Sequence, residues 1–97
     1  MKKAIIYVRG NKEKMQEIIC RLYASEKGYK ILYATTNMDD VNLCDVLLVS
    51  NPSRISRNHV EYEEIVLKLK KRGIQVESVA NQDNDFESMS LTMDLMK

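Results

Sequence analysis

Four short runs of apolar residues punctuate the chain, and each has the length of a buried strand. They cover Lys3–Arg9, Tyr29–Ala34, Asp45–Ser50 and Ile74–Val79. Branched aliphatic residues dominate these runs, which is typical of strands buried on both faces of a parallel sheet. We therefore expect four strands that belong to one sheet.

A helical pattern separates the first strand from the second. Apolar residues recur there at i, i+3, i+4 and i+7, namely Met15, Ile18, Ile19 and Leu22. This spacing predicts a helix whose apolar stripe faces the sheet and whose opposite side, with Cys20, is partly exposed. Asn11 is placed to cap the start of this helix, and Gly28 to end it.

A second helical pattern lies between the third and fourth strands. Its apolar stripe consists of Tyr62, Ile65, Val66 and Leu69. Asn58 followed by Glu61 resembles a capping box at its start, and Gly73 is placed to stop it. The second and third strands are joined by residues 35–44, a stretch too short for a full crossover helix. We expect at most one helical turn in that connection.

The resulting order predicts an α/β fold: a small three-layer domain with a mostly parallel four-stranded sheet. We expect right-handed crossovers and a strand order of about 2-1-3-4. Ninety-seven residues suffice for one such domain with one core, so we expect residues 1–97 to form a single domain.

Charge and cysteine content narrow the functional classes. The 15 basic and 14 acidic residues leave a net charge of +1, so no global basic field attracts nucleic acid. Cys20 and Cys44 form no CxxC motif, and we expect reduced thiols in a cytoplasmic protein. No metal-binding motif, cofactor motif, signal peptide or membrane span is expected.

Three arginines follow the two central strands of the predicted sheet. Arg54 and Arg57 come after the third strand, and Arg9 ends the first. The carboxyl ends of these strands meet at the switch point of a 2-1-3-4 sheet, where ligands of open α/β folds bind. Guanidinium groups suit phosphate, so the pattern predicts a phosphate or sulfate pocket. The alternative is that Arg54 and Arg57 are solvated loop residues.

These motifs resemble a known family of DNA enzymes. The segment from Tyr7 to Asn11 resembles the Tyr-x-Arg-Val-Ser opening of the serine recombinase (resolvase/invertase) catalytic domain. The segment from Ser53 to Asn58 resembles that family's Asp-Arg-Leu-x-Arg signature. The resemblance spans about residues 4–79 and implies site-specific DNA strand exchange through a covalent serine–DNA intermediate. It also implies that Arg9, Arg54 and Arg57 bind the DNA phosphate.

The departures from the family pattern concern the chemistry. Asn11 stands at the nucleophile position, and an amide cannot replace a serine alkoxide. Ser53 stands where the family has an aspartate, and Cys20 stands where a glutamine is expected. No arginine occurs between Arg21 and Arg54, where the family carries another. We therefore expect a catalytically inactive domain that retains part of the phosphate site.

Two other hypotheses remain open. The chain could be an active recombinase fragment that uses a displaced serine, with His59 as a conceivable base; the candidates are Ser50, Ser53 and Ser56. It could instead be a generic α/β protein-interaction domain. A receiver domain, a Walker P-loop and a low-molecular-weight phosphatase are excluded, because their acidic, glycine-lysine and cysteine-arginine motifs are missing.

The expected partners follow from the same reasoning. We expect weak binding to the DNA phosphate backbone, or association with a recombinase partner, and no membrane. We expect no separate C-terminal DNA-binding module of the family's type in this chain. The Met-rich segment 83–97 lies where the family begins its dimerisation helix, so we expect a homo-oligomer.

Overall fold

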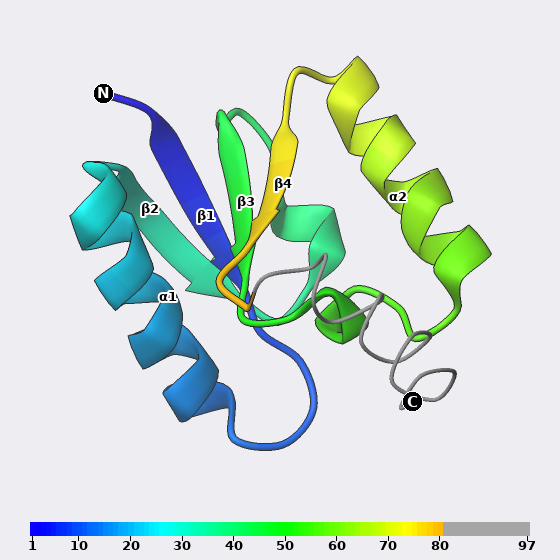
Figure 1. The fold of residues 1–97 in the computed structure, drawn as a ribbon. Helices are drawn as coiled ribbons and strands as arrows, with labels where there is room; N and C mark the ends of the chain where they lie inside the picture. Colours follow the sequence, from blue (N-terminus) through cyan, green and yellow to red (C-terminus); the bar gives the residue numbers. More distant parts are fainter. Residues whose placement is uncertain (81–97) are drawn as a thin grey trace, which may run out of the picture.

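The computed structural model describes residues 1–80, which contain a four-stranded sheet (Figure 1). Its strands are β1 (Lys3–Tyr7), β2 (Lys30–Thr35), β3 (Val46–Val49) and β4 (Gln75–Ser78). Every paired strand is parallel to its neighbour, and the order is β2-β1-β3-β4. The predicted parallel sheet and its strand order are confirmed, with strand ends shifted by one or two residues.

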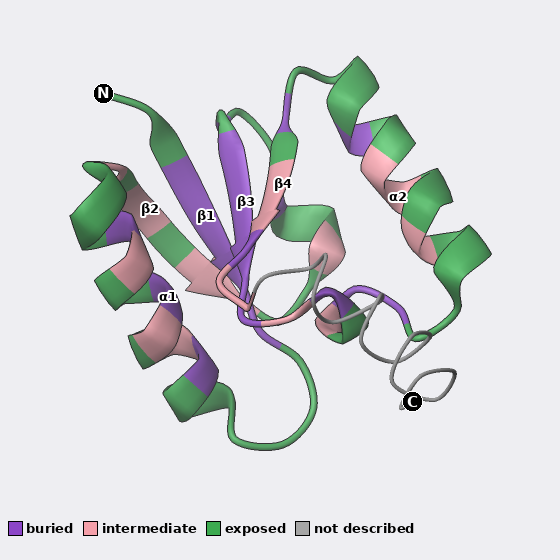
Figure 2. Cartoon of the chain, in the orientation of Figure 1, coloured by how far each residue is buried: buried purple, intermediate pink, exposed green. Residues whose placement is uncertain are grey.

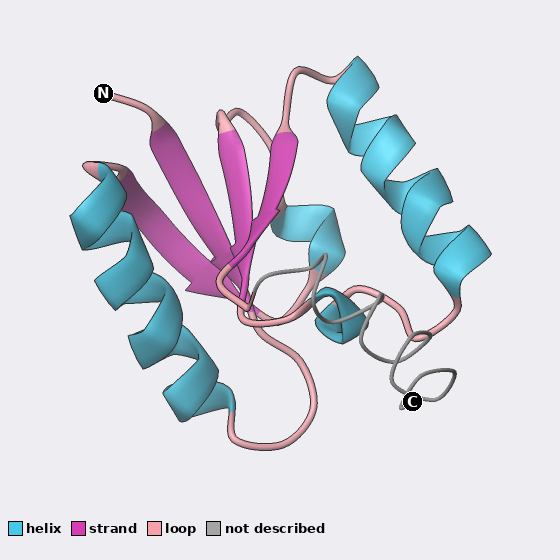
Figure 3. Cartoon of the chain, viewed as in Figure 1, coloured by secondary structure: helices cyan, strands magenta, loops and turns pink. Residues whose placement is uncertain are grey.

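Two helices cover the two faces of the sheet (Figures 1 and 3). Helix α1 (Glu13–Lys27) lies on one face and α2 (His59–Lys71) on the other, with short 3-10 turns η1 (Met38–Asp40) and η2 (Pro52–Arg54). Each face has its own apolar cluster, because alternate residues of β1 and β3 point to opposite sides. The predicted three-layer arrangement is therefore confirmed.

The centre of the core is the pair β1 and β3 (Figure 2). The side chains with no exposed surface include Ile5, Ile6, Leu47 and Leu48. The outer strands are less covered, and in β2 Tyr33 is 41% exposed. Burial therefore concentrates on the two strands whose carboxyl ends lead to the predicted phosphate pocket.

The predicted orientation of α1 is wrong. Met15, Ile18 and Leu22 are 55%, 48% and 64% exposed, and the buried residues of α1 are Gln16, Cys20 and Ala24. The small side chains of Cys20 and Ala24 join the cluster over β1 and β3, where a larger residue would hold the helix further from the sheet. Cys20 is fully buried, and burial raises the pKa of its thiol to about 12.

The start of α1 also differs from the prediction. Lys12, not Asn11, occupies the N-cap position, with φ of 60°, and its side chain makes no capping hydrogen bond. The predicted cap by Asn11 is therefore wrong. The predicted end is confirmed, since Gly28 closes the helix in the left-handed conformation with φ of 78°.

Helix α2 follows its predicted pattern. Leu69 is buried, and Tyr62 and Ile65 pack against the same core cluster. The Oδ1 atom of Asn58 accepts a hydrogen bond from the Glu61 amide over 3.1 Å, which confirms the predicted cap. The other half of a capping box differs, because the Glu61 carboxylate bonds to Ser56 instead.

The connection from β2 to β3 is as short as expected. Its single 3-10 turn, η1, is capped by the side chain of Asn37, which accepts from the Asp39 amide over 2.9 Å. The predicted limit of one turn is confirmed. The predicted association helix in residues 83–97 lies outside the described residues.

Candidate phosphate-binding site

A pocket of about 510 Å³ opens at the carboxyl ends of β1 and β3. We call it the arginine pocket; its lining residues are Arg9, Gly10, Ser53, Arg54, Ser56, Arg57, Asn58 and Glu61. All three predicted arginines lie among them, because β1 and β3 are adjacent strands. Whether they bind phosphate stays a prediction.

Two of the arginines are fixed to each other's loops. Arg54 Nη1 donates to the backbone carbonyl of Arg9 over 3.2 Å, and Arg9 Nη1 donates to the carbonyl of Ile55 over 3.4 Å. Gly10 permits this approach, since a Cβ atom there would lie 3.2 Å from Arg54 Nη1. The two hydrogen bonds join the loop after β1 to the loop after β3 and set the width of the arginine pocket.

One N–H group of Arg54, that of Nε, is buried without a hydrogen-bond partner among the described residues. A buried guanidinium N–H without an acceptor costs free energy, on the order of 1–3 kcal/mol.

Gln16 holds the loop that carries Arg9. Its side chain is 3% exposed, and its Oε1 atom accepts from the Arg9 amide over 3.0 Å. Its Nε2 atom donates to the carbonyls of Arg9, at 2.9 Å, and Asn11, at 2.7 Å. Gln16 is not among the residues that the sequence pattern predicted for the site. The available signal was the i, i+4, i+8 spacing of Gln16, Cys20 and Ala24.

Asn11 and Ser53, two of the positions that depart from the family pattern, differ in their position relative to the arginine pocket. Asn11 is exposed and does not line the arginine pocket, and its carbonyl is engaged by Gln16. Ser53 lines the pocket, but its hydroxyl donates to Asn51 Oδ1 over 2.6 Å. An amide oxygen is not a base, so this contact does not activate the Ser53 hydroxyl.

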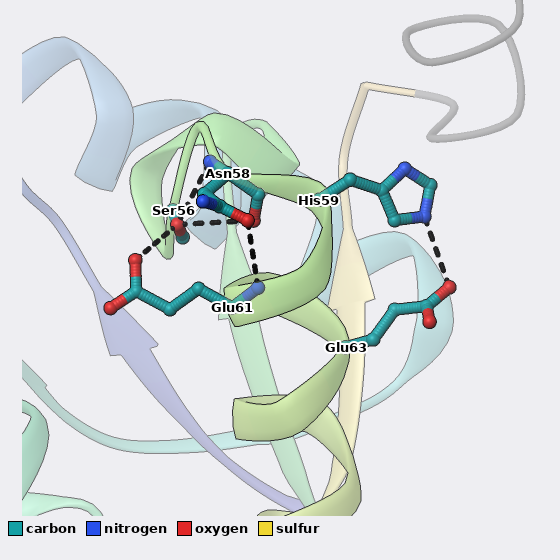
Figure 4. A network of polar contacts seen from close by, with 5 residues as sticks. All are labelled: Ser56, Asn58, His59, Glu61 and Glu63. Atoms are coloured by element: carbon teal, nitrogen blue, oxygen red, sulfur yellow. Dashed lines mark hydrogen bonds and ion pairs between the residues drawn. The ribbon is translucent and has the colours of Figure 1, made fainter.

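Ser56 forms the most connected polar group beside the arginines (Figure 4). Its hydroxyl donates to Glu61 Oε1 over 2.7 Å and accepts from the Asn58 amide over 3.0 Å. His59 is exposed on another side of α2, where its Nε2 atom lies 3.0 Å from Glu63 Oε2. The arrangement places Ser56 with a carboxylate and leaves His59 outside the arginine pocket.

The third candidate serine, Ser50, does not line the arginine pocket and is buried, as is Tyr7 of β1. Asp39 and Asp40 lie in η1, where Asp40 accepts from the Thr35 hydroxyl over 2.9 Å. Within residues 1–80 no three His, Cys, Asp or Glu side chains are grouped as metal ligands.

A separate polar cluster links α1 and β2 to β4. The hydroxyl of Tyr29 lies 2.9 and 3.0 Å from the two carboxylate oxygens of Glu77, and the hydroxyl of Tyr23 donates over 3.1 Å. Burial, together with the Glu77 hydrogen bond and charge, raises the pKa of Tyr29 to about 12 and also raises that of Tyr23. This cluster stabilises the face covered by α1 and does not adjoin the arginine pocket.

A 2-1-3-4 parallel sheet with arginines at its switch point defines an open α/β domain with an arginine-lined pocket. The model of the family "Resolvase, N terminal domain" matches residues 33–97, about two thirds of the chain. The chain belongs to this family. The match includes Arg54 and Arg57, whereas Arg9 and Asn11 precede it.

Two solved structures share the fold. The C-terminal catalytic domain of ISC1926 TnpA, an IS607-like serine recombinase, aligns with a TM-score of 0.67 and 21% identity, over 97% of this chain and 78% of that chain. The N-terminal catalytic domain of TP901-1 integrase aligns with a TM-score of 0.71 and 19% identity, over 95% and 90%. No curated protein matches the chain. Neither helix within residues 1–80 combines the length and apolar character needed to cross a membrane.

Proposed function

We propose that this chain is a recombinase-type domain that holds a DNA phosphate in the arginine pocket without cleaving the strand. The observation that carries the proposal is the convergence of Arg9, Arg54 and Arg57 on one pocket, with the Arg9 and Arg54 side chains each hydrogen-bonded to the loop that carries the other. Fixed guanidinium groups favour phosphate oxygens, because the charged hydrogen bonds form without reorganising the protein.

The absence of cleavage follows from Asn11 at the nucleophile position. Its amide nitrogen is delocalised and cannot attack phosphorus as an alkoxide does. It also lies outside the residues that line the arginine pocket. Phosphoryl transfer needs an in-line nucleophile as well as positive charge, and the proposed domain supplies the charge alone.

Binding is tested with a fluorescein-labelled duplex and anisotropy at low salt. We expect Arg54→Ala to weaken binding at least tenfold, since a charged hydrogen bond contributes about 1.5–3 kcal/mol. Arg21→Ala is the control, because Arg21 is an exposed arginine on α1 that pairs with Glu17 at 2.8 Å. Equal affinities of Arg54→Ala and Arg21→Ala would refute a phosphate site in the arginine pocket.

Cleavage is tested by the adduct that a serine recombinase leaves on DNA. Wild type and Asn11→Ser are incubated with supercoiled DNA, denatured, and examined for nicks and covalent protein–DNA species. We expect no adduct with wild type, and Asn42→Ser serves as the control for a serine placed in another exposed loop. An adduct with wild type would contradict the proposal that the domain is inactive.

Ser56 supports a second candidate function, that of an active recombinase fragment with a displaced nucleophile. Its hydroxyl lines the arginine pocket and donates to the Glu61 carboxylate, which could accept its proton. An adduct formed by wild type and lost in Ser56→Ala, but kept in Ser53→Ala, would establish this function.

The inactive phosphate-binding domain of the first proposal would act through a recombinase partner or a second copy of this chain. Light scattering with and without DNA would detect either association.

A further inference from the structure

Half of the lysines and arginines in residues 1–80 lie far from the arginine pocket, at the opposite edge of the sheet. Seven exposed lysines begin β1 and β2 or end α1 and α2: Lys2, Lys3, Lys27, Lys30, Lys68, Lys70 and Lys71. We call this set the amino edge. Figure 1 shows the amino ends of all four strands and the carboxyl ends of both helices on this side of the molecule.

These lysines form two groups, one toward each end of the sheet edge. Lys30 pairs in register with Lys3, and the Lys30 amide donates to the Lys2 carbonyl over 2.8 Å. Asp45 and Gln75 stand between the two groups at the amino ends of β3 and β4, and α2, which ends with the other lysines, packs beside β4. Neighbouring strands lie about 4.8 Å apart, so four strands span about 14 Å.

Few opposite charges neutralise these lysines within residues 1–80. Glu26 and Asp45 lie at the amino edge, and Glu64 lies one helical turn before Lys68. The Asp45 carboxylate accepts from the Lys3 amide over 2.8 Å. At the carboxyl edge of the sheet, by contrast, the carboxylate of Glu61 lies among the arginines and offsets part of their positive charge. The net charge of +1 therefore conceals a strongly positive amino edge.

We propose that the amino edge is a second contact surface for the phosphate backbone of duplex DNA, separate from the arginine pocket. The width of about 14 Å is close to the major groove of B-DNA, about 12 Å, so lysines at its two ends reach phosphates on both strands. Lysine is a flexible point charge, which suits backbone contacts without base readout.

An anionic membrane is the less suitable partner. A surface that lies on a bilayer needs a broad apolar face beside its cations. Among residues 1–80, the large exposed apolar side chains near the amino edge are Met1, Leu43 and Leu67, against seven lysines. Charge therefore dominates the surface. The proposal goes beyond the arginine pocket and does not depend on it.

The test measures how duplex affinity depends on salt, using a labelled 24-base-pair duplex of arbitrary sequence. Lys3→Gln/Lys30→Gln and Lys70→Gln/Lys71→Gln each remove two positive charges from the amino edge. Lys14→Gln/Arg21→Gln removes two from the exposed surface of α1 and is the matched control. Each lost phosphate contact lowers the slope of log K against log salt by about 0.9.

We expect each amino-edge pair to lower the slope by up to about 1.8 and the affinity at low salt on the order of tenfold, with the control near wild type. Amino-edge slopes equal to the control slope would overturn the proposal, as would binding to phosphatidylserine vesicles but not to duplex. Arg54→Ala/Arg57→Ala is measured in parallel. If only Arg54→Ala/Arg57→Ala lowers duplex affinity, the arginine pocket binds DNA and the proposal for the amino edge is refuted. If only the amino-edge pairs lower it, the amino edge binds DNA and the phosphate site in the arginine pocket is refuted.

Discussion

Arg54 donates a hydrogen bond from Nη1 to the backbone carbonyl of Arg9, although 45 positions separate them in the chain. Arg9 in turn donates to the carbonyl of Ile55. Each arginine therefore donates one hydrogen bond to the loop that carries the other, and its guanidinium group has further N–H donors that a ligand can use. The positions of two guanidinium groups in the arginine pocket are coupled through the backbone.

Gly10→Ala tests this coupling. The new Cβ atom would lie 3.2 Å from Arg54 Nη1, and φ at Gly10 is +83°. We expect a loss of about 1–2 kcal/mol in the free energy of unfolding from the backbone strain, and weaker duplex binding from displacement of Arg54. Gly28→Ala is the matched control, because φ is +78° there and no atom lies within 4 Å.

The two glycine variants separate strain from function. Both should lower the melting temperature, whereas Gly10→Ala alone should lower the affinity for duplex DNA. Equal affinities of the two variants would show that the contact between Gly10 and Arg54 has no role in binding.

Gln16→Leu tests the support of the loop after β1. The substitution removes three hydrogen bonds, those of the Gln16 side chain with the Arg9 amide and with the carbonyls of Arg9 and Asn11. We expect a loss of about 2–3 kcal/mol in the free energy of unfolding, because each lost hydrogen bond costs about 1 kcal/mol. Urea denaturation measures it, with Gln75→Leu, at an exposed glutamine of β4, as the control. A loss no larger than in that control would contradict the assigned role.

The Cys20 thiol gives the fold a dependence on alkaline pH. Its pKa of about 12 exceeds the usual 9.0, so between these values the folded chain keeps a proton that the unfolded chain releases. The free energy of unfolding should therefore fall as pH rises from 9 to 12. Urea denaturation at pH 8 and 10.5 should show a smaller fall for Cys20→Ala than for wild type. Parallel losses in both proteins would exclude this contribution.

Tyr29 reports on the cluster around Glu77. Its pKa of about 12 lies above the usual 10.0, through burial and through the hydrogen bond and charge of Glu77. We expect Glu77→Gln to lower this pKa, because the glutamine amide carries no charge. Absorbance at 295 nm during an alkaline titration measures tyrosine ionisation. Glu63→Gln, which removes an exposed carboxylate of α2 beside His59, should leave the curve unchanged.

The strands and their order could be predicted because each strand is a compact apolar run and the crossover rules admit few topologies. The placement of the arginines followed from that topology. Arg9 and Arg54 share a pocket because β1 and β3 are neighbours, and their distance in sequence is irrelevant.

The orientation of α1 could not be predicted from its apolar pattern. The stripe of Met15, Ile18 and Leu22 faces outward, and the buried side is defined by small residues and one glutamine. The rotation of α1 about its axis is set by the close contact of Cys20 and Ala24 with the sheet and by the three hydrogen bonds of Gln16 to the loop after β1. The spacing of apolar residues carries no information about either interaction. The same reason explains why Gln16 was missed and why the cap was wrongly assigned to Asn11.

The arginine pocket exists only while β1 and β3 are paired, because its walls come from the two loops that follow them. An unfolded chain holds Arg9 and Arg54 apart and offers an anion no such site. Any phosphate that occupies the arginine pocket must therefore stabilise the fold, by RT ln(1 + [L]/Kd) for a ligand that binds the folded state alone. The free energy of unfolding therefore rises with occupancy of the site. The increase measured at a series of phosphate concentrations gives the Kd of the arginine pocket for phosphate.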